Sequence, residues 1–276
     1  MRFFENHASF YFFFFFMLLV LYSLILSTTQ QKITQWNYLF NIANALFYII
    51  VGLTAFYGAK LHTFKSSVGR ELFSIGIGMI CFALGLISWA YYNLVLKIAI
   101  PYPSFADVFF VLYIPFLGYG IINLLREFGV FFSRKIILVS LIIFICSSLF
   151  VFFFGNPPDL SMNIPFIAKA FNLFYLFTDS FLLTLSIMVI LLTRGKIHKS
   201  FLFFILALFI MALADFTFSY RSGAEIYWNG DVSDILYALA ALCFSIGITQ
   251  TIFAQIRTAK PMLPPEKQLG NNIPQM

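Results

Sequence analysis

Eight long apolar segments dominate this sequence and limit what it can fold into. A helix needs about 20 mostly apolar residues to cross the hydrocarbon core of a bilayer, and each segment is long enough. Polar or helix-breaking residues separate the segments, for example Pro101 and Pro103 after the third. The pattern therefore predicts an all-α, polytopic membrane helix bundle with eight transmembrane helices. The predicted helices are residues 8–28, 37–60, 71–97, 104–126, 135–154, 164–193, 199–221 and 232–257.

Composition excludes the main alternatives to a membrane protein. Hydrophobic residues make up 61% of the chain and charged residues 10%, and the mean hydropathy is +0.92. Soluble domains carry about 25% charged residues, so neither a water-soluble domain nor a disordered chain fits. Cys81, Cys146 and Cys243 all lie inside apolar segments and indicate neither a disulfide framework nor a metal site. The proline-rich residues 259–276 predict a disordered cytoplasmic tail.

The distribution of Lys and Arg predicts the orientation in the membrane. With eight helices, both termini and the loops after every second helix lie on one side. Of the 17 Lys and Arg residues, Lys32, Lys97 and Arg221 fall on the other side, Lys169 falls within a helix, and the rest share the side of the termini. Because basic residues are enriched in cytoplasmic loops, both termini are expected to be cytoplasmic, in a multi-pass protein of the cell membrane. This placement explains the net charge of +6 without a nucleic-acid partner.

The two halves of the sequence align with each other. Leu46–Tyr48 aligns with Leu173–Tyr175, and the same shift aligns Ser104–Asp107 with Asp231–Asp234. We therefore predict two four-helix repeats, residues 1–130 and 131–258, which have the same orientation because four is an even number of helices. The first apolar segment could instead be a signal peptide. It lacks a clear cleavage site and has a counterpart in the second repeat, so we expect it to be retained.

Charged residues inside the predicted helices are the first candidates for function, because a charge within a membrane is costly. They are Asp107, Lys169, Asp179, Asp215 and Asp234. Four of them are expected at one depth, in the outer half of the membrane. Lys169 and Asp215 are interpreted either as an ion pair between neighbouring helices or as groups lining a pocket. Asp179 lies deeper and is a candidate ion or proton site.

Two of these aspartates also have a structural interpretation. Ser104 precedes Asp107 by three residues, and Asp231 precedes Asp234 by three, which is the spacing of a helix-capping box. An acidic group in the first turn also suits the helix dipole. Ser104 and Asp231 are therefore predicted helix caps. Asp107 and Asp234 could act in capping, in ligand contact or in both.

Aromatic residues gather at the predicted outer ends of the third and seventh helices, Trp89 and Tyr220 among them. They form either an interfacial aromatic belt, which is common in membrane proteins, or the wall of a pocket.

Sequence motifs for enzymes are absent. The three histidines, His7, His62 and His198, fall in predicted cytoplasmic tails or loops, and no nucleophile-elbow, zinc-protease or nucleotide-binding motif occurs. No catalytic residue, metal or cofactor is therefore predicted, and only hydrolysis by aspartates alone stays open as a form of catalysis.

Two short motifs resemble a known class of membrane region. A Pro103–Asp107 step opens a helix and is followed by Tyr113 and Pro115, and the second half carries Asp215–Tyr220 followed by Tyr227–Tyr237. Over about residues 36–257 the chain resembles the polytopic N-terminal membrane sensor region of prokaryotic diguanylate cyclase, phosphodiesterase and histidine kinase proteins. The resemblance implies a sensor, and because no output domain follows the eighth helix, it implies a separate cytoplasmic signalling partner.

The sequence thus predicts an integral membrane sensor or ligand-binding module. Its small-molecule or lipid ligand would occupy a polar pocket on the outer-leaflet side of the bilayer. One alternative is a small-solute or ion-coupled transporter that uses Asp179. Others are a lipid-modifying enzyme with paired carboxylates, and a structural subunit of a membrane complex. The residues predicted to line the pocket are Asp107, Lys169, Asp215, Asp234, Trp89 and Tyr220.

Overall fold

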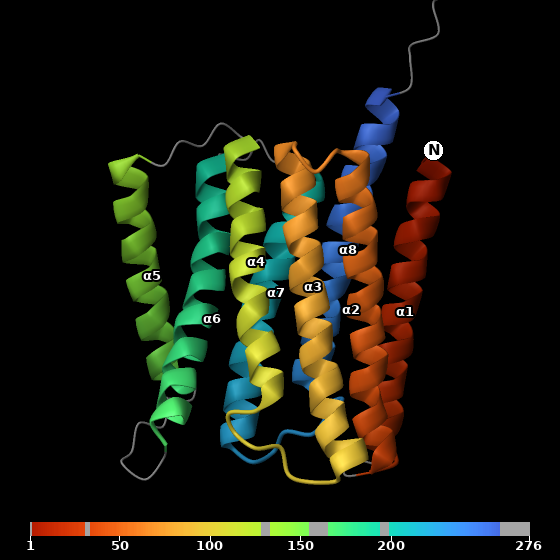
Figure 1. Cartoon of the computed structure of the whole chain (residues 1–276), viewed down its shortest axis with the longest axis vertical. Helices are drawn as coiled ribbons and strands as arrows, with labels where there is room; N and C mark the ends of the chain where they lie inside the picture. The colour runs from red at the N-terminus through yellow and green to blue at the C-terminus, as the bar shows by residue number, and fades with distance from the viewer. Residues whose placement is uncertain (1, 31–33, 128–132, 155–164, 194–198, 260–276) are drawn as a thin grey trace, which may run out of the picture.

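The protein is a bundle of long, nearly parallel or antiparallel helices (Figure 1). The computed structural model describes residues 2–30, 34–127, 133–154, 165–193 and 199–259. In this part of the chain, eight helices are long and apolar enough to cross a membrane, which confirms the predicted all-α, multi-pass membrane fold. The helices are α1 (Arg2–Thr28), α2 (Gln35–Leu61), α3 (Ser67–Tyr91), α4 (Phe105–Glu127), α5 (Arg134–Phe154), α6 (Phe166–Thr193), α7 (Lys199–Gly223) and α8 (Val232–Ala259), with a π-helical turn, η1 (Tyr92–Leu96), continuing α3.

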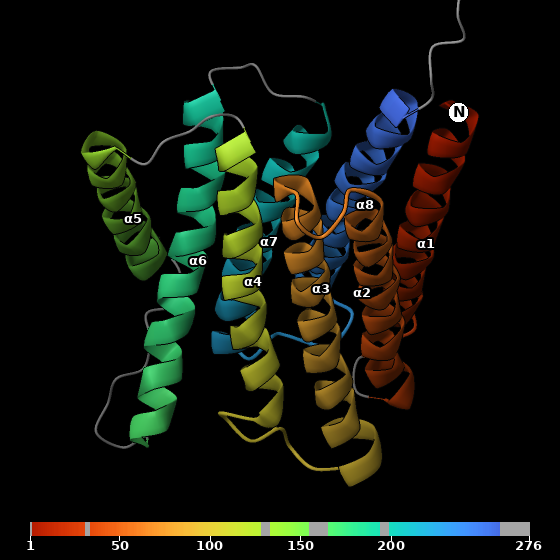
Figure 2. The same cartoon turned by 45° about the horizontal axis from the view of Figure 1, so that its top comes forward.

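A closed ring of helices surrounds the core. In the order α2, α3, α4, α6, α7 and α8, each helix packs against the next, and α8 packs against α2. Outside the ring, α1 lies against α2 and α8, and α5 lies against α6 at the opposite edge of the bundle (Figure 2). This neighbour order is consistent with the two predicted repeats, residues 1–130 and 131–258, which stay a prediction.

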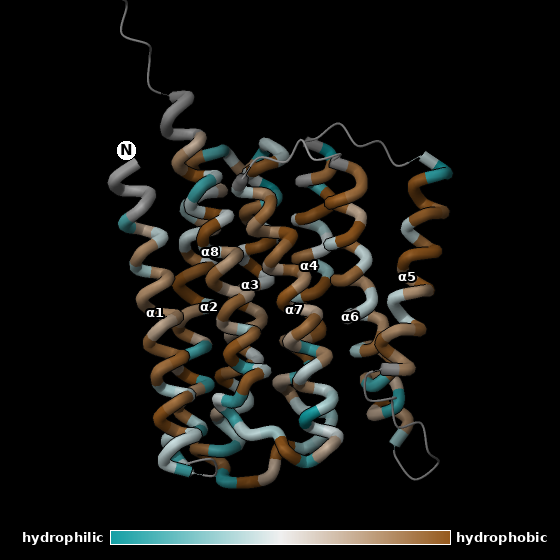
Figure 3. Tube along the Cα trace, turned by 180° about the vertical axis from the view of Figure 1, so that it is seen from behind, coloured by the Kyte–Doolittle hydropathy of each residue, from teal (hydrophilic) through white to brown (hydrophobic). Residues whose placement is uncertain are grey.

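Position in the bundle decides how much of each helix is buried. In the most apolar window of α8, 72% of the residues are buried, whereas in that of α5 only 6% are. The outer faces carry large apolar side chains such as Phe13, Leu53 and Ile142, all about half-exposed. Hydrophobic residues dominate the middle of the helices and hydrophilic ones gather toward both ends (Figure 3). Because lipid covers exposed apolar side chains, this surface suits a multi-pass membrane protein.

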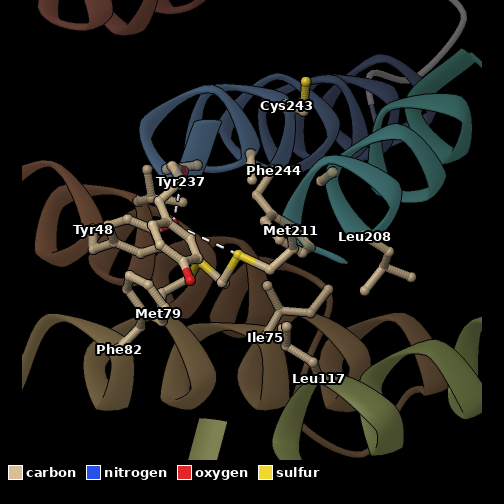
Figure 4. Close-up of a cluster of buried hydrophobic side chains, with 14 of the residues drawn as sticks. Tyr48, Ile75, Met79, Phe82, Leu117, Leu208, Met211, Tyr237, Cys243 and Phe244 are labelled. Carbon is tan, nitrogen blue, oxygen red and sulfur yellow. Dashed lines mark hydrogen bonds between the residues drawn. The ribbon is translucent and has the colours of Figure 1, made fainter. Parts of the chain in front are cut away.

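The core is tightly packed around Tyr48 of α2 (Figure 4). Its hydroxyl donates a hydrogen bond of 2.7 Å to the carbonyl oxygen of Tyr237 and lies 3.8 Å from the sulfur of Met211. Its ring stacks on that of Phe82 with 4.5 Å between centroids. Met79 is fully buried beside this group. The result is an apolar layer across the bundle that joins α2, α3, α7 and α8.

The chain places its two ends on one side of the bundle. The N-terminus of α1 and the C-terminal end of α8 lie at the same end, and the connections from α3 to α4 and from α7 to α8 lie at the other (Figure 1). The predicted helix boundaries agree with the structure to within a few residues, except that α1 starts earlier, at Arg2. The predicted tail lies outside the described residues beyond Ala259.

The third helix begins four residues earlier than predicted. Ser66 caps α3, because its side-chain oxygen accepts the N–H of Gly69 at 2.9 Å. Glu71 was predicted as the first residue of this helix. It therefore lies more than one turn inside α3 and is 0% exposed. It is a buried acidic residue that the sequence prediction missed.

Candidate functional site

A cavity of about 620 Å³ lies toward the end of the bundle opposite the termini. Ligand pockets in proteins are typically about 300–1,000 Å³, so the cavity is large enough for a small molecule. Side chains from seven of the helices line it, together with both connections at this end. Its polar lining comprises Asn41 of α2, Tyr102 of the α3–α4 connection, Asp107 and Tyr113 of α4, Asn172, Tyr175 and Thr178 of α6, Asp215, Ser219 and Ser222 of α7, Tyr227 of the α7–α8 connection, and Asp234 and Tyr237 of α8.

Asp107 lies in the first turn of α4 and joins α4 to α6. One carboxylate oxygen, Oδ2, accepts the backbone N–H of Ser104 at 2.6 Å and the Ser104 hydroxyl at 2.7 Å. The other, Oδ1, accepts the hydroxyl of Tyr175 at 2.6 Å. Asp107 therefore closes the start of its own helix and also binds the neighbouring helix at the cavity wall.

Asp234 occupies the equivalent position in α8. Its Oδ2 atom accepts the N–H of Gly230 at 2.6 Å and the hydroxyl of Tyr227 at 3.2 Å. Asp231 caps the same helix, because its Oδ1 accepts the N–H of Ser233 at 2.8 Å. Asp231 also forms an ion pair with Arg221, which fixes the α7–α8 connection.

Asp215 lies deeper in the cavity. It is eight residues before the end of α7, which places it about 12 Å below that end. Two tyrosine hydroxyls donate to its carboxylate, Tyr237 at 2.6 Å and Tyr113 at 3.1 Å. These tyrosines come from α8 and α4, so this carboxylate links three helices of the ring.

Two groups of aromatic rings form the apolar walls. Trp89, Phe218 and Tyr227 contact one another edge to face, with centroid distances from 4.8 to 6.4 Å. Phe82 is the centre of the second group and lies 5.2–5.3 Å from the rings of Phe110, Tyr113 and Tyr237. Each group therefore includes a tyrosine whose hydroxyl binds a cavity carboxylate.

A network of asparagines anchors the α7–α8 connection to α2. The amide nitrogen of Asn37 donates to the carbonyl of Asn229, and that of Asn41 donates to the side-chain oxygen of Asn229 at 2.9 Å. Asn41 is 1% exposed and lines the cavity, yet its own Oδ1 atom has no hydrogen-bond partner. A buried acceptor without a donor costs about 1–3 kcal/mol, so this oxygen is an unsatisfied polar atom on a residue of the cavity wall.

The cavity combines carboxylates with neutral donors. Among the described residues, no Lys, Arg or His side chain lines it. Burial, with a smaller contribution from Asp107, raises the pKa of Tyr102 to about 12. Burial, Asp234 and Asp231 together raise the pKa of Tyr227 well above its usual value. Both phenols therefore stay protonated at neutral pH and serve as hydrogen-bond donors.

The structure brings together four of the six predicted pocket residues. Asp107, Asp215, Asp234 and Trp89 line the cavity. Lys169 and Tyr220 do not line it, and Tyr220 is 56% exposed on the outer side of α7.

The ion pair considered for Lys169 and Asp215 is not formed, although both side chains are described. Tyrosine hydroxyls bind Asp215 instead. The side chain of Asp179 lies outside the described residues.

The prediction missed the tyrosines that hold the carboxylates, Tyr113, Tyr175 and Tyr237. A single tyrosine in an apolar helix is more often interpreted as a membrane-interface residue. One sequence signal was available, because the predicted repeat aligns Tyr48 with Tyr175. In the structure, both hydroxyls bond to a neighbouring helix.

Comparisons with protein-family models, curated proteins and solved structures find no match to this chain.

Proposed function

We propose that the protein is an integral membrane sensor. A ligand binds in the cavity, and the bundle passes the signal to a separate cytoplasmic protein. The observation that carries this proposal is that the polar lining bridges the two predicted repeats. Asn41 and Asp107 come from the first, Tyr175 and Asp234 come from the second, and a hydrogen bond already joins Asp107 to Tyr175. A ligand at these groups would set the spacing between the halves.

Helix α8 supplies a route from the cavity to the end of the bundle that carries the termini. Asp234 lies in its first turn, and the helix runs for 28 residues, or about 40 Å. A signal requires two arrangements of the bundle that bind the ligand with different affinity. A shift of the first turn of α8, caused by ligand contact with Asp234, would move the whole helix. Its far end would then present a changed surface to the cytoplasmic partner.

The packed layer beneath the cavity favours a sensor over an open pathway. Tyr48, Met79 and Met211 are fully buried there, among packed apolar side chains from several helices. The resemblance to sensor regions of prokaryotic signalling proteins supports the same function.

Co-purification tests the sensor. The tagged protein would be isolated from its native membrane in mild detergent, and bound proteins and small molecules would be identified by mass spectrometry. We expect a cytoplasmic kinase, cyclase or phosphodiesterase whose activity in the complex changes in Asp107→Asn and Asp215→Asn. Glu225→Gln, an exposed carboxylate at the same end of the bundle, is the matched control. A complex whose activity is the same in all variants, or recovery of no such enzyme, would contradict the proposal.

An ion-coupled transporter is the second candidate, because buried polar side chains also occur away from the cavity. Glu71 is fully buried in α3, and both amide atoms of Asn44 are buried without a hydrogen-bond partner. Transport would require the apolar layer to open, and buried polar groups in membranes often mark ion routes. Proton flux into proteoliposomes that is lost in Glu71→Gln would favour this candidate over the sensor.

A further inference from the structure

We infer that the ligand of this cavity is a small organic ammonium ion, a protonated amine whose N–H groups bind Asp107, Asp234 and the side-chain oxygen of Asn41. The inference rests on the proposed role of the cavity as a ligand site, and it adds the chemical class of the ligand. It would hold for a sensor and for a transporter alike.

The first argument is the chemistry of two buried carboxylates that line the cavity, Asp107 and Asp234. The hydrogen bonds to Asp107 come from a serine and a tyrosine, and those to Asp234 come from a tyrosine and a backbone N–H. These neutral donors fix the carboxylates without supplying a positive charge. Asp231 differs, because Arg221 pairs with it directly. A buried carboxylate is stabilised when a cation approaches it, so the cavity has the charge that an ammonium ligand needs.

The second argument is the unused acceptor on Asn41. Its amide nitrogen donates to Asn229, which assigns the oxygen as the atom that faces no donor. The residue is 1% exposed, and its side chain lines the same cavity as the two carboxylates. A ligand with N–H groups would satisfy this oxygen, whereas an anion or a hydrocarbon would leave it without a partner.

The third argument is the aromatic lining. Trp89, Phe218 and Tyr227 form a three-ring group on the cavity wall, next to Asp234. Cations bind favourably over the faces of such rings, and tryptophan is the best of them. An organic cation can contact carboxylates with its charged end and the rings with its carbon chain.

Other ligand classes fit less well. The described residues contain no group of three or more His, Cys, Asp or Glu side chains placed to hold a metal ion. Among the described residues, the lining also offers no basic side chain for an anion. The volume of about 620 Å³ exceeds what a bare ion needs and suits a molecule of several carbon atoms.

Thermal stability of the purified protein in lipid nanodiscs tests the inference with four probes. Cadaverine is a diamine, pentanediol and glutarate are its neutral and anionic counterparts of equal chain length, and choline is a quaternary ammonium ion without N–H donors. We expect cadaverine to raise the Tm most, choline to raise it less, and the other two to leave it unchanged, since binding to the folded state stabilises it.

Variants locate the binding site. Asp107→Asn and Asp234→Asn should each weaken cadaverine binding by about tenfold or more, because each removes a charge-assisted hydrogen bond. Glu225→Gln, the exposed control, should change it by less than about twofold. If the aspartate variants fail to fold, the comparison of cadaverine with pentanediol on the wild-type protein still decides the ligand class.

Failure of the inference and failure of the proposed function are distinguishable. Stabilisation by glutarate or pentanediol equal to that by cadaverine would overturn the ammonium ligand and leave a binding cavity. Cadaverine binding that is unchanged in both aspartate variants would also overturn it. Amine binding at the aspartates, combined with a partner enzyme that does not respond, would keep the ligand class and contradict the sensor.

Discussion

At the scale of single residues, tyrosine hydroxyls explain how carboxylates persist inside this membrane protein. A bare carboxylate in an apolar environment is costly, and hydrogen bonds to a charged group contribute about 1.5–3 kcal/mol each. Tyr175, Tyr227 and the pair Tyr113 and Tyr237 each donate to a different aspartate of the cavity. The phenols therefore act as structural partners of the acidic groups.

Tyr175→Phe tests this role. The change removes the 2.6 Å hydrogen bond to Asp107 and keeps the ring, so we expect a loss of about 1.5–3 kcal/mol in the free energy of unfolding. Tyr119→Phe is the control, because Tyr119 is exposed on α4. Removal of its hydroxyl should lower the free energy of unfolding by less than about 0.5 kcal/mol. Thermal unfolding in detergent measures both. Equal Tm values for the two variants would show that the Tyr175 hydroxyl contributes nothing.

At the scale of helices, the two helices that start at the cavity share one construction. Near the start of α4 and of α8, a carboxylate in the first turn accepts a backbone N–H from just before the helix, Ser104 for Asp107 and Gly230 for Asp234. Caps of this kind satisfy donors that the helix itself cannot reach. The start of each helix is thus fixed by groups that also line the cavity.

Two substitutions of Asp231 distinguish its role as the cap of α8 from its role in the ion pair with Arg221. Asp231→Ala removes both the cap of α8 and the partner of Arg221, and we expect a cost of about 2 kcal/mol in stability. Asp231→Asn keeps an oxygen for the N–H of Ser233, so its cost should be at most half as large. Amide hydrogen exchange at Ser233 should accelerate in the alanine variant. Equal losses in both variants would assign the whole effect to the ion pair.

The turn between α2 and α3 depends on a glycine. A Cβ atom at Gly69 would lie 1.9 Å from the carbonyl oxygen of Thr63, which is backbone and cannot rotate away. Gly69→Ala should therefore destabilise the protein by about 1–3 kcal/mol. Gly78→Ala is the matched control on α3, because its Cβ would meet the side chain of Leu117 at 3.3 Å. A smaller Tm loss for Gly69→Ala than for Gly78→Ala would contradict the close approach.

At the scale of the whole molecule, the bundle has two different ends. The cavity and the α3–α4 and α7–α8 connections lie at one end, and both described ends of the chain lie at the other. If basic residues mark the cytoplasmic side, the cavity faces outward. A ligand outside the cell could then reach it without crossing the membrane.

Cysteine labelling tests this orientation. In a background with Cys81, Cys146 and Cys243 replaced by alanine, Glu225→Cys would place a thiol at the cavity end and Lys65→Cys at the other. A membrane-impermeant maleimide should label Glu225→Cys in intact cells, and Lys65→Cys only after permeabilisation. The reverse pattern would put the cavity on the cytoplasmic side and rule out an external ligand.

The sequence by itself determined the number of long apolar helices in the described part of the chain, and most of their limits to within a few residues. A membrane-spanning segment must form all of its backbone hydrogen bonds within itself, because lipid offers no partners. A long apolar segment therefore folds as a helix. The place of Asp107 and Asp234 in the first turn is equally local, because proline and glycine end the preceding connections. Glu71 was missed because Ser66 caps α3, so that the helix begins four residues before the predicted start.

Only the tertiary structure decided which side chains meet at the cavity. Tyr175 lies 68 residues from Asp107, and Asn41 lies 188 residues from Asn229. Lys169 and Tyr220 were predicted in the pocket and do not line it. These helices are apolar on most sides, so their sequence does not fix the rotation of each helix about its axis. Packing against neighbouring helices sets that rotation, and with it the side chains that a ligand can reach.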